Sequence, residues 1–461
     1  MNEQLSRKDL INATLLSFKI TTYDFEEIQG AAVTLYKFRP QLGVRVSKIR
    51  GLKDELAAVL GVPSVRIIAP LADGSVGIEV PNKQKPILPL PEILCSPEYL
   101  TSDMALPLAI GRTITNEIFM ADLADMPHLL VAGATGQGKS VGLNVMLMSL
   151  LHKKTPEELK LVLIDLKQVE LNVYSKLGSA YLAAPVITEA EEAECVLESL
   201  CELMKERYDL IGSVGKRNIK EYNALTIVEP MPYIVVVIDE YGDLIMQSGK
   251  QTEHSICRLA QKARAVGIHL IISTQRPSST IVTGNIKANF PARIAFRTTT
   301  GFESRIIINC AGAEKLTGCG DMIFFAGAET TRVQCAYASI EEVSKSCEEI
   351  GELNADYKGE EILKKPEEQH VYVHEVQLTA PIHRFTKAAA YLVSDHNAVT
   401  ETWVKVHANM DVMDARRVFN QLIELGIVES CKSPYHVKGS PFRRVLMHDK
   451  DEISRLIDRF S

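Results

Sequence analysis

Five hydrophobic runs of strand length recur between residues 128 and 297. They are HLLVAG (128–133), KLVLIDL (160–166), YIVVVIDE (233–240), HLIISTQ (269–275) and ARIAFR (292–297). Helical patterns lie between them, among them residues 190–211 and 252–267. Strands that are hydrophobic on both faces and alternate with helices are typical of a parallel, doubly wound α/β sheet. We therefore predict such a sheet over residues 98–345.

The flanking segments follow different patterns. Residues 1–97 predict a small α+β domain, with a helix at 7–19, a strand in AVTLYKFRP and then VRVSKI, a short helix DELAAVLG, VRIIAP and VGIEV. Its proline-rich end, 81–97, is typical of a linker. Residues 346–380 are charged and weakly periodic, which also predicts a linker. Residues 381–461 predict three short helices and a two-stranded wing, the pattern of a winged helix.

The segment between the first hydrophobic run and the next helix has a chemical signature. GATGQGKS matches the pattern GxxxxGK[ST] and stands between a strand and a helix, the context that a P-loop requires. Glycines allow the tight turn that points backbone N–H groups at phosphate oxygens. The lysine then reaches the β- and γ-phosphates, and the serine ligates Mg²⁺. We predict that ATP contacts Gly133, Ala134, Thr135, Gly136, Gln137, Gly138, Lys139, Ser140 and Val141.

Two carboxylates end the third hydrophobic run. Asp239 and Glu240 follow the strand YIVVVI. Hydrolysis needs one carboxylate in the shell of the Mg²⁺ ion and another that activates the attacking water. We assign the first role to Asp239, together with Ser140, and the second to Glu240. An acidic pair at a strand end is also common without any function.

The fourth run ends in a glutamine and an arginine. Gln275 can detect the γ-phosphate or position water, and Arg276 can stabilise developing charge. A solvent-exposed polar turn is the alternative explanation. Gln275 is included among the predicted catalytic residues with Lys139 and Glu240.

These motifs resemble one family. PHLLVAGATGQGKSVGLN, MPYIVVVIDEYGDLIM, RLAQKARAVGIHLIISTQRP, IVTGNIKANFPARIAFR and GAEKLTGCGDMIF occur in this order between residues 127 and 324. They resemble the soluble motor of the FtsK/SpoIIIE family of DNA translocases, within the HerA/FtsK group of P-loop ATPases. VTLYKFRP, GVRVSKI and GSVGIEVPN resemble the first motor subdomain of that family, and the C-terminal segment more weakly resembles its DNA-orienting domain. The resemblance implies a RecA-like motor domain.

The resemblance also implies a hexameric ring around double-stranded DNA, with ATP sites between subunits. Such a site needs an arginine from the neighbouring subunit. The first candidate is Arg264, in QKARAVGIHL; Arg293, Arg297 and Arg305 are rivals, and a solvated helix-end arginine is the plain alternative.

The C-terminal segment supplies candidate DNA contacts. Arg416 and Arg417 lie on the predicted recognition helix, and Arg443 and Arg444 on the predicted wing. Residues 382–461 contain 12 Lys and Arg against 10 Asp and Glu, while the chain as a whole has a net charge of −7. Contact with DNA must therefore come from local basic surfaces. A winged helix is also a common protein-interaction module.

The composition adds few constraints. The nine cysteines show no spacing typical of a metal site, so we expect reduced thiols and neither zinc nor a disulfide. No hydrophobic run approaches the roughly 20 residues that cross a bilayer, so we expect a soluble, cytoplasmic chain.

The sequence departs from the family at several points. Members typically carry N-terminal membrane spans and a long linker, so we expect a soluble variant or a shortened chain. Leu166 replaces a usual proline, and Asn309 with Cys310 replaces an acidic position. Lys167 is a candidate contact for nucleotide or DNA, although a surface lysine is an equal alternative.

The function predicted from these observations is ATP-dependent translocation of double-stranded DNA by a homo-oligomeric ring, in chromosome segregation or transfer of a mobile element. A recombinase or a division protein is a possible partner. Two alternatives stay open: a related ATPase that moves protein or nucleoprotein cargo, and a nucleotide-gated DNA clamp.

Overall fold

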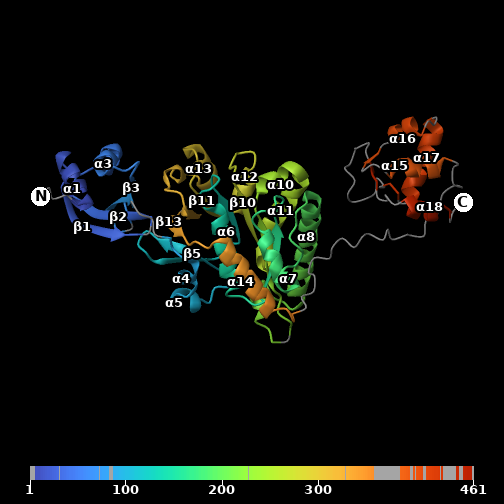
Figure 1. Ribbon diagram of the computed structural model, residues 1–461, viewed down its shortest axis with the longest axis horizontal. Coiled ribbons are helices and arrows are strands. Elements are labelled where there is room, and N and C mark those ends of the chain that lie inside the picture. Colours follow the sequence, from blue (N-terminus) through green and yellow to red (C-terminus); the bar gives the residue numbers. More distant parts are fainter. Residues whose placement is uncertain are drawn as a thin grey trace. The chain divides into compact units, whose positions relative to one another are not determined.

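The computed structural model describes two parts of the chain. The first comprises residues 6–357 without 31, 72, 83–86, 227 and 328; the second comprises residues 385–458 without 395–397, 400, 409–411, 426, 429–442 and 446–449. They belong to two compact units, Met1–Lys365 and Pro366–Ser461, which are described separately (Figure 1).

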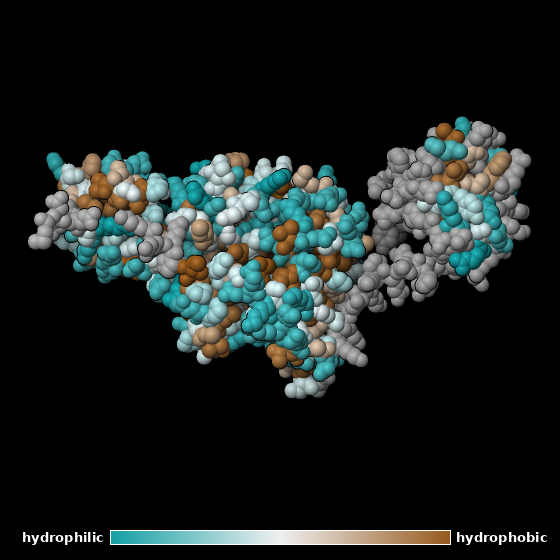
Figure 2. All heavy atoms as spheres, viewed as in Figure 1, coloured by the Kyte–Doolittle hydropathy of each residue, from teal (hydrophilic) through white to brown (hydrophobic). Residues whose placement is uncertain are grey.

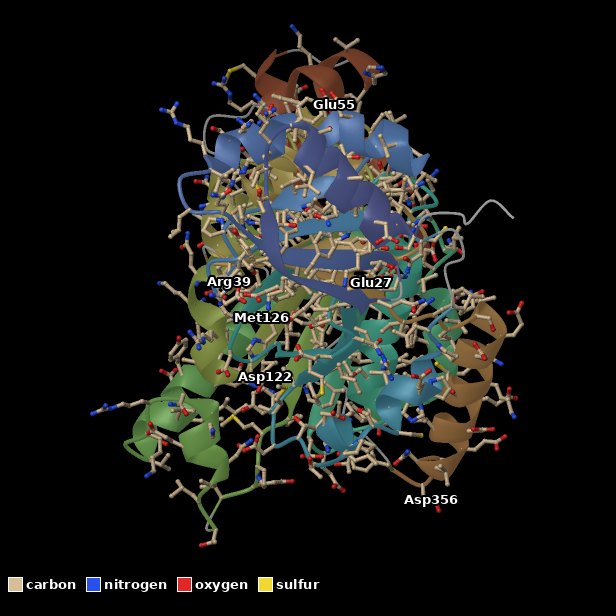
Figure 3. The ribbon with its side chains drawn as sticks, turned by 90° about the vertical axis from the view of Figure 1, so that its left-hand side faces the viewer. Glu27, Arg39, Glu55, Asp122, Met126 and Asp356 are labelled. Carbon is tan, nitrogen blue, oxygen red and sulfur yellow. The ribbon has the colours of Figure 1, made fainter. Side chains whose placement is uncertain are left out.

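The N-terminal part of the first unit is a four-stranded antiparallel sheet covered by helices. The strand order is β1-β2-β4-β3. Its elements are α1 (Arg7–Ser17), β1 (Thr22–Gln29), β2 (Val33–Pro40), α2 (Val46–Gly51), α3 (Lys53–Leu60), β3 (Arg66–Ile68) and β4 (Val76–Pro81). Ser6 and Asp9 form a capping box that begins α1. Figure 3 shows Glu27 of β1 and Arg39 of β2 on this sheet.

A nine-stranded mixed sheet forms the centre of the first unit. Its order is β6-β5-β13-β12-β11-β7-β10-β9-β8. Its strands are β5 (Pro107–Thr113), β6 (Ile118–Asp122), β7 (His128–Ala132), β8 (Leu159–Ile164), β9 (Tyr233–Ile238), β10 (Ile268–Thr274), β11 (Ala292–Phe296), β12 (Asp321–Ala326) and β13 (Glu329–Cys335). The five strands predicted from the hydrophobic runs are β7 to β11, and they pair in parallel.

The sheet continues beyond those five strands. β12, β13, β5 and β6 extend it from β11 through antiparallel pairs, so the prediction of a wholly parallel sheet is wrong for this half. Two of these pairs, β5–β6 and β12–β13, are hairpins with short connections, which favour antiparallel pairing. Figure 3 shows Asp122 and Met126 where the edge strand β6 ends.

Helices bury both faces of this sheet. They are α4 (Leu90–Leu94), α5 (Pro97–Leu100), α6 (Lys139–Leu151), η1 (Asn172–Leu177), α7 (Gly178–Tyr181), α8 (Ala190–Ser213), α9 (Ile219–Asn223), α10 (Tyr241–Ser248), α11 (Lys250–Lys262), η2 (Ala263–Val266), α12 (Gly284–Asn289), α13 (Gly301–Ile308), η3 (Ala313–Lys315) and α14 (Ile340–Leu353). Figure 1 shows α8, α10 and α11 grouped beside the sheet.

Alternate residues of the parallel strands enter two different cores. Leu161 and Val235 pack with α6 and α14, whereas Val162 and Val236 pack with α8 and α11. This alternation explains why the runs are hydrophobic at every position. On the face that Figure 2 draws, hydrophobic residues of the first unit form small patches among polar ones.

Two predicted linkers differ from the structure. Within 81–97, residues Leu90 and Ile93 of α4 are buried in the same core as α6. Residues 346–353 belong to α14, whose Val343 and Cys347 enter that core too. Because many positions of α14 are charged and its hydrophobic stripe is narrow, the helix was not identified from the sequence. The rest of the predicted linker, from 358 to 380, lies outside the described residues.

The described residues of the second unit form four short helices and a small sheet. α15 (Thr386–Val393), α16 (Glu401–His407) and α17 (Val412–Glu424) correspond to the three predicted helices, and α18 (Lys450–Asp458) is an additional one. β14 (Ala398–Val399) pairs with β15 (Arg443–Arg444). A core that includes Val393, Phe419, Leu422 and Ile453 joins the helices. The winged-helix assignment stays a prediction, because most of the predicted wing lies outside the described residues.

Candidate functional site

The P-loop connects the central strand β7 to helix α6. Gly136 and Gly138 adopt positive φ angles of 74° and 110°, which glycine tolerates without strain. The turn also packs closely on its surroundings. A Cβ on Gly133 would lie 2.6 Å from Cβ of Phe296, and one on Gly142 would lie 2.6 Å from Cζ of the same ring. Small residues are therefore required on both sides of the turn.

Lys139 joins the P-loop to the end of β9. Its Nζ donates to Oδ1 of Asp239 at 2.7 Å, to the backbone oxygen of Asp239 at 3.0 Å and to Oγ of Ser273 at 2.9 Å. Lys139 is 3% exposed and Asp239 2% exposed. A buried charge requires such partners, and this pair brings the predicted lysine and metal ligand together.

Glu240 is held at the boundary between β9 and α10. Its Oε1 accepts from the hydroxyl of Thr274 at 2.6 Å, and its Oε2 accepts from the backbone N–H of Gln275 at 2.9 Å. Both donors belong to the end of β10, the strand beside β9. The predicted general base is therefore fixed in orientation by its neighbouring strand.

Gln275 lies against the P-loop itself. Its Oε1 accepts from the hydroxyl of Thr135 at 2.7 Å. Lys139, Asp239, Glu240 and Gln275 thus meet at one edge of the sheet, where parallel strands β7, β9 and β10 end. This is the usual place for ligands in open α/β sheets.

Glu170, at this edge of the sheet, was not predicted from the sequence. Its Oε1 accepts a hydrogen bond from Oγ of Ser140 at 2.5 Å. Glu170 follows β8, where its backbone N–H donates to the carboxylate of Asp165 at 2.9 Å. The signal available in the sequence was the acidic residue that follows KLVLIDL by a few positions, at the same edge as Asp239.

Lys167 makes a contact in the same segment. Its Nζ lies 2.8 Å from Oδ2 of Asp243 in α10, and the hydrogen bond with this carboxylate raises the pKa of Lys167. The pair ties the turn after β8 to the helix that follows Glu240.

The donor set fits a nucleotide with magnesium. Mg²⁺ prefers oxygen ligands and commonly uses one or two carboxylates together with substrate phosphates. Here the hydroxyl of Ser140 and the carboxylate of Asp239 flank the first turn of α6, whose free N–H groups attract phosphate. Within the described ranges, no group of three or more His, Cys, Asp or Glu side chains could hold a metal ion.

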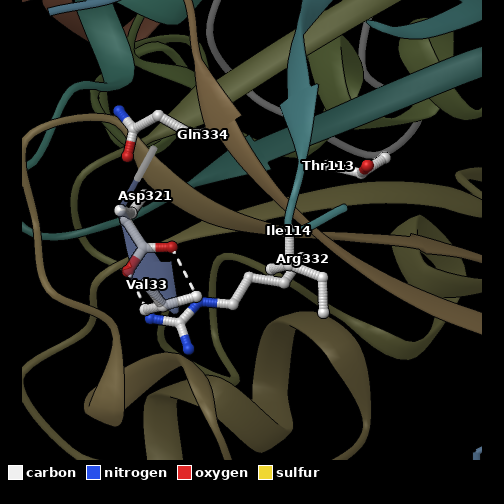
Figure 4. Close-up of a pocket in the computed structure, with 7 residues that line it drawn as sticks. Val33, Thr113, Ile114, Asp321, Arg332 and Gln334 are labelled. Carbon is white, nitrogen blue, oxygen red and sulfur yellow. Dashed lines mark hydrogen bonds and ion pairs between the residues drawn. The ribbon is translucent and has the colours of Figure 1, made fainter. Parts of the chain in front are cut away.

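A loop before β12 backs the P-loop. The N–H of Gly320 donates to the backbone oxygen of Gln137 at 3.1 Å, and a Cβ on Gly138 would lie 2.8 Å from the nitrogen of Gly320. The next residue, Asp321, accepts from the N–H of Thr317 at 2.7 Å. Asp321 also pairs with Arg332, as Figure 4 shows. Arg332 in turn contacts Glu79 of β4 in the N-terminal sheet.

Arg264 lies in η2, which precedes the amino end of β10. Because the P-loop follows the carboxyl end of the parallel strand β7, Arg264 is at the opposite edge of the sheet from its own P-loop. The side chain is exposed.

The rival arginines have different surroundings. Arg293 is buried, and its guanidinium donates to the backbone oxygens of Phe290, Ile307 and Lys287. These bonds commit Arg293 to its own subunit. Arg297 and Arg305 are exposed.

The predicted DNA contacts belong to the second unit. Arg416 and Arg417 are exposed on α17, whose Ala415 and Val418 face the core. Arg443 and Arg444 pair through their backbones with Val399 and Ala398.

The fold and this constellation define a P-loop ATPase. The FtsK/SpoIIIE family model matches residues 89–279, and the FtsK alpha domain model matches residues 1–82. The chain belongs to the FtsK/SpoIIIE family.

Named relatives agree with this assignment. The chain is 38% identical to DNA translocase FtsK of Chlorobaculum tepidum over 466 residues, covering 98% of this chain and 57% of that protein. It is 39% identical to DNA translocase SpoIIIE of Bacillus subtilis over 459 residues, covering 96% of this chain and 56% of that protein. The chain thus spans little more than half the length of these relatives. None of the helices in the described ranges is both long and apolar enough to cross a membrane.

Solved structures share the fold. The conjugation coupling protein TcpA of pCW3, solved as a monomer with ATPγS, is 25% identical, with a TM-score of 0.54, and the match covers 75% of this chain and 99% of TcpA. The type VII secretion ATPase EccC of Thermomonospora curvata is 22% identical, with a TM-score of 0.51, over 57% of this chain and 34% of that one. The second likeness concerns the fold alone.

Proposed function

We propose that this protein hydrolyses ATP to move double-stranded DNA, and that it works as a ring of identical subunits, most simply a hexamer. The observation that carries the proposal is the convergence of Lys139, Asp239, Glu240 and Gln275 at one sheet edge, in a chain whose relatives are named DNA translocases. The cytoplasm is the proposed location.

The residues divide the chemistry among them. The P-loop amides and Lys139 bind the phosphates, while Ser140 and Asp239 hold Mg²⁺, which neutralises charge on the phosphates when bound. Glu240 accepts the proton of the attacking water. Its hydrogen bonds from Thr274 and Gln275 fix the carboxylate for that task. Gln275, which contacts Thr135, links the general base to the P-loop and reports the γ-phosphate.

In this proposal, a neighbouring subunit supplies the arginine that completes each ATP site. Arg264 is exposed and lies across the sheet from its own P-loop, so it does not serve the site of its own subunit. A ring places this edge against the next P-loop, where an arginine stabilises charge that develops during phosphoryl transfer.

DNA is the proposed cargo. In a ring, contact with the phosphate backbone is sequence-tolerant and sensitive to salt. The second unit, with Arg416 and Arg417 on α17 and Arg443 and Arg444 on β15, is proposed as a winged-helix domain that orients the motor on DNA. A recombinase or a division protein is the proposed protein partner. The likeness to a conjugation coupling protein keeps transfer of nucleoprotein as the second candidate.

The test is the ATPase rate with and without linear duplex DNA, combined with particle images and displacement of a triplex-forming strand. We expect strong stimulation by duplex, rings in the images and strand displacement during ATP turnover. Little stimulation by duplex would favour protein cargo. DNA binding and ATP turnover without strand displacement would identify a nucleotide-gated clamp. A monomer at all concentrations, with turnover indifferent to duplex, contradicts the proposal.

Arg264 is tested by mixing subunits. Arg264→Ala and Glu240→Gln subunits each fail alone, but in mixed rings some interfaces combine an intact Glu240 with an intact Arg264. We expect mixing to restore part of the ATPase activity. No recovery from rings that images show to be mixed would contradict a contribution in trans.

A further inference from the structure

We propose that Glu170 is a positioning residue for the magnesium ion of the nucleotide site, acting through the hydroxyl of Ser140. The inference rests on the proposed function, because it concerns the same site, and it adds a carboxylate to which neither the sequence motifs nor the family comparisons assign a role.

The contact itself is specific. The hydroxyl of Ser140 donates its proton to Oε1 of Glu170 at 2.5 Å, within the range of charge-assisted O–H···O⁻ bonds. A serine hydroxyl has one proton and two lone pairs. When the O–H of Ser140 is hydrogen-bonded to Glu170, the lone pairs of the hydroxyl oxygen face away from that carboxylate and are available to a metal ion. Partners that orient metal ligands in this way tune the affinity for the metal.

The segment that carries Glu170 is built to hold it there. Asp165, at the end of β8, is 1% exposed and accepts from three backbone N–H groups: Lys167 at 3.1 Å, and Glu170 and Leu171 at 2.9 Å each. These bonds fold residues 165–171 into a tight turn. A buried carboxylate that is satisfied by three local donors fixes the turn rather than serving as a ligand.

A second contact fixes the same segment to the same helix. The hydroxyl of Tyr174 donates to Oδ1 of Asn144 at 2.9 Å, and both side chains are buried. Ser140 and Asn144 lie one turn apart on α6, and residues four apart share one helix face. The segment after β8 is therefore attached to α6 at two points, of which only Glu170 lies at the nucleotide edge.

Charge supports the assignment. Asp239, the other proposed magnesium ligand, is already paired with Lys139 at 2.7 Å, so the P-loop lysine neutralises its charge. Glu170 contributes a negative charge beside Ser140, and within the described part of the chain its carboxylate accepts a hydrogen bond only from the serine hydroxyl. A divalent cation bound at Ser140 is stabilised by that charge.

The experiment measures binding of a fluorescent ATP analogue to the full chain in the presence of Mg²⁺ and in the presence of EDTA. For Glu170→Ala, we expect the gain in affinity that Mg²⁺ provides to fall about tenfold, with unchanged affinity in EDTA. Glu170→Gln keeps an oxygen that accepts from Ser140, so its loss should be smaller. With Mn²⁺ as the probe, the electron paramagnetic resonance spectrum of the bound ion should differ between Glu170→Ala and wild type.

Tyr174→Phe is the matched control, because it removes the other attachment of the segment without touching Ser140. We expect it to retain the full effect of Mg²⁺. The inference is overturned if Glu170→Ala keeps the wild-type effect of Mg²⁺, if it loses affinity equally in EDTA, or if Tyr174→Phe reproduces its defect. Should Glu170→Ala not fold, Glu170→Gln decides by the same criteria.

The wild-type chain separates this inference from the proposed function. Wild type that binds nucleotide with Mg²⁺ but does not move DNA refutes translocation and leaves the role of Glu170 to be decided by the variants. Wild type that binds no nucleotide refutes both.

Discussion

Arg332 and Asp321 form a buried, two-point ion pair between the neighbouring strands β13 and β12. Nε and Nη2 of Arg332 donate to the two carboxylate oxygens of Asp321 at 2.9 and 2.7 Å. The remaining nitrogen of the guanidinium donates to Glu79 of the N-terminal sheet. Desolvation, the largest single influence, acts to lower the pKa of Arg332, but the hydrogen bonds and negative charges of Asp321 and Glu79 together outweigh it and raise that pKa. One side chain thus connects the loop behind the P-loop with the N-terminal sheet.

Arg332→Met should destabilise the first unit by about 3–5 kcal/mol, because it removes the guanidinium that two buried carboxylates share. Urea unfolding of the full chain, monitored by a probe in the first unit, measures the change. The matched control is Lys176→Met, which removes the exposed pair with Glu348 and should cost no more than about 1 kcal/mol. Equal losses of unfolding free energy in the two variants would show that the buried network stabilises the fold no more than an exposed ion pair does.

Gly142→Ala should destabilise the protein by about 1–3 kcal/mol, the usual cost of forcing extra volume into a packed core. Its new Cβ would lie 2.6 Å from Cζ of Phe296. Phe296→Leu removes that ring edge, so the double variant should be more stable than the sum of the two single losses predicts. A double-mutant cycle by chemical denaturation measures the coupling.

Gly212→Ala is the control for that cycle. Gly212 lies in α8, and a Cβ there meets nothing within 4 Å. Because alanine is the better helix former, this change should leave stability equal or slightly higher. Additive effects of Gly142→Ala and Phe296→Leu would contradict the predicted clash.

Acidification should destabilise the fold through two buried histidines. Burial lowers the pKa of His128 to about 3 and that of His269 to about 4, against an ordinary value near 6.5. Below about pH 6.5 the unfolded chain binds more protons at these sites than the folded chain does, so stability falls as the pH falls toward 4. Each group contributes about 1.4 kcal/mol per pH unit at most.

Denaturation curves at pH 7.5 and pH 5.5 check this prediction. His269→Asn removes one of the two titrating groups, and its stability should therefore depend less steeply on pH than that of the wild type. His128 has a structural reason to resist protonation, because its Nδ1 accepts from the backbone N–H of Leu270 at 3.0 Å. A steeper pH dependence in His269→Asn would contradict the assignment.

Two substitutions at the nucleotide site separate binding from hydrolysis. Lys139→Ala should abolish ATPase activity, because it removes the charge that contacts the phosphates. Glu240→Gln should bind ATP normally but hydrolyse it about 10²–10⁴-fold more slowly, the usual contribution of a general base. Steady-state turnover and equilibrium nucleotide binding measure the two effects. Wild-type turnover in Glu240→Gln would refute the role given to this carboxylate.

The sequence predicted the parallel half of the sheet and the P-loop because both have strong local signals. Leu161 and Val162 enter opposite cores, so the hydrophobic run around them was readable without knowledge of tertiary contacts. Gly138 belongs to the GxxxxGK[ST] pattern, whose spacing alone indicates a phosphate-binding loop. β12 and β13 were not identified as part of the sheet. They form a hairpin, but the hairpin joins the sheet through pairing with β11 and with the distant β5, which no local pattern marks.

Glu170 and Arg332 show what the local pattern could not supply. Glu170 meets Ser140 only because the turn after β8 folds back onto α6 through Asp165. Arg332 meets Glu79 across 253 positions of sequence. Both contacts join polar residues with no fixed spacing between them, so no periodicity marks them.

The shared guanidinium has an evolutionary consequence. Asp321, Arg332 and Glu79 are buried and linked through one guanidinium, so a change at one position leaves charge at the others less well compensated. We expect the three positions to vary together among relatives, with neutral residues replacing them as a set. Such coordinated substitution would indicate that the N-terminal sheet and the nucleotide-binding sheet have evolved together as one structural unit.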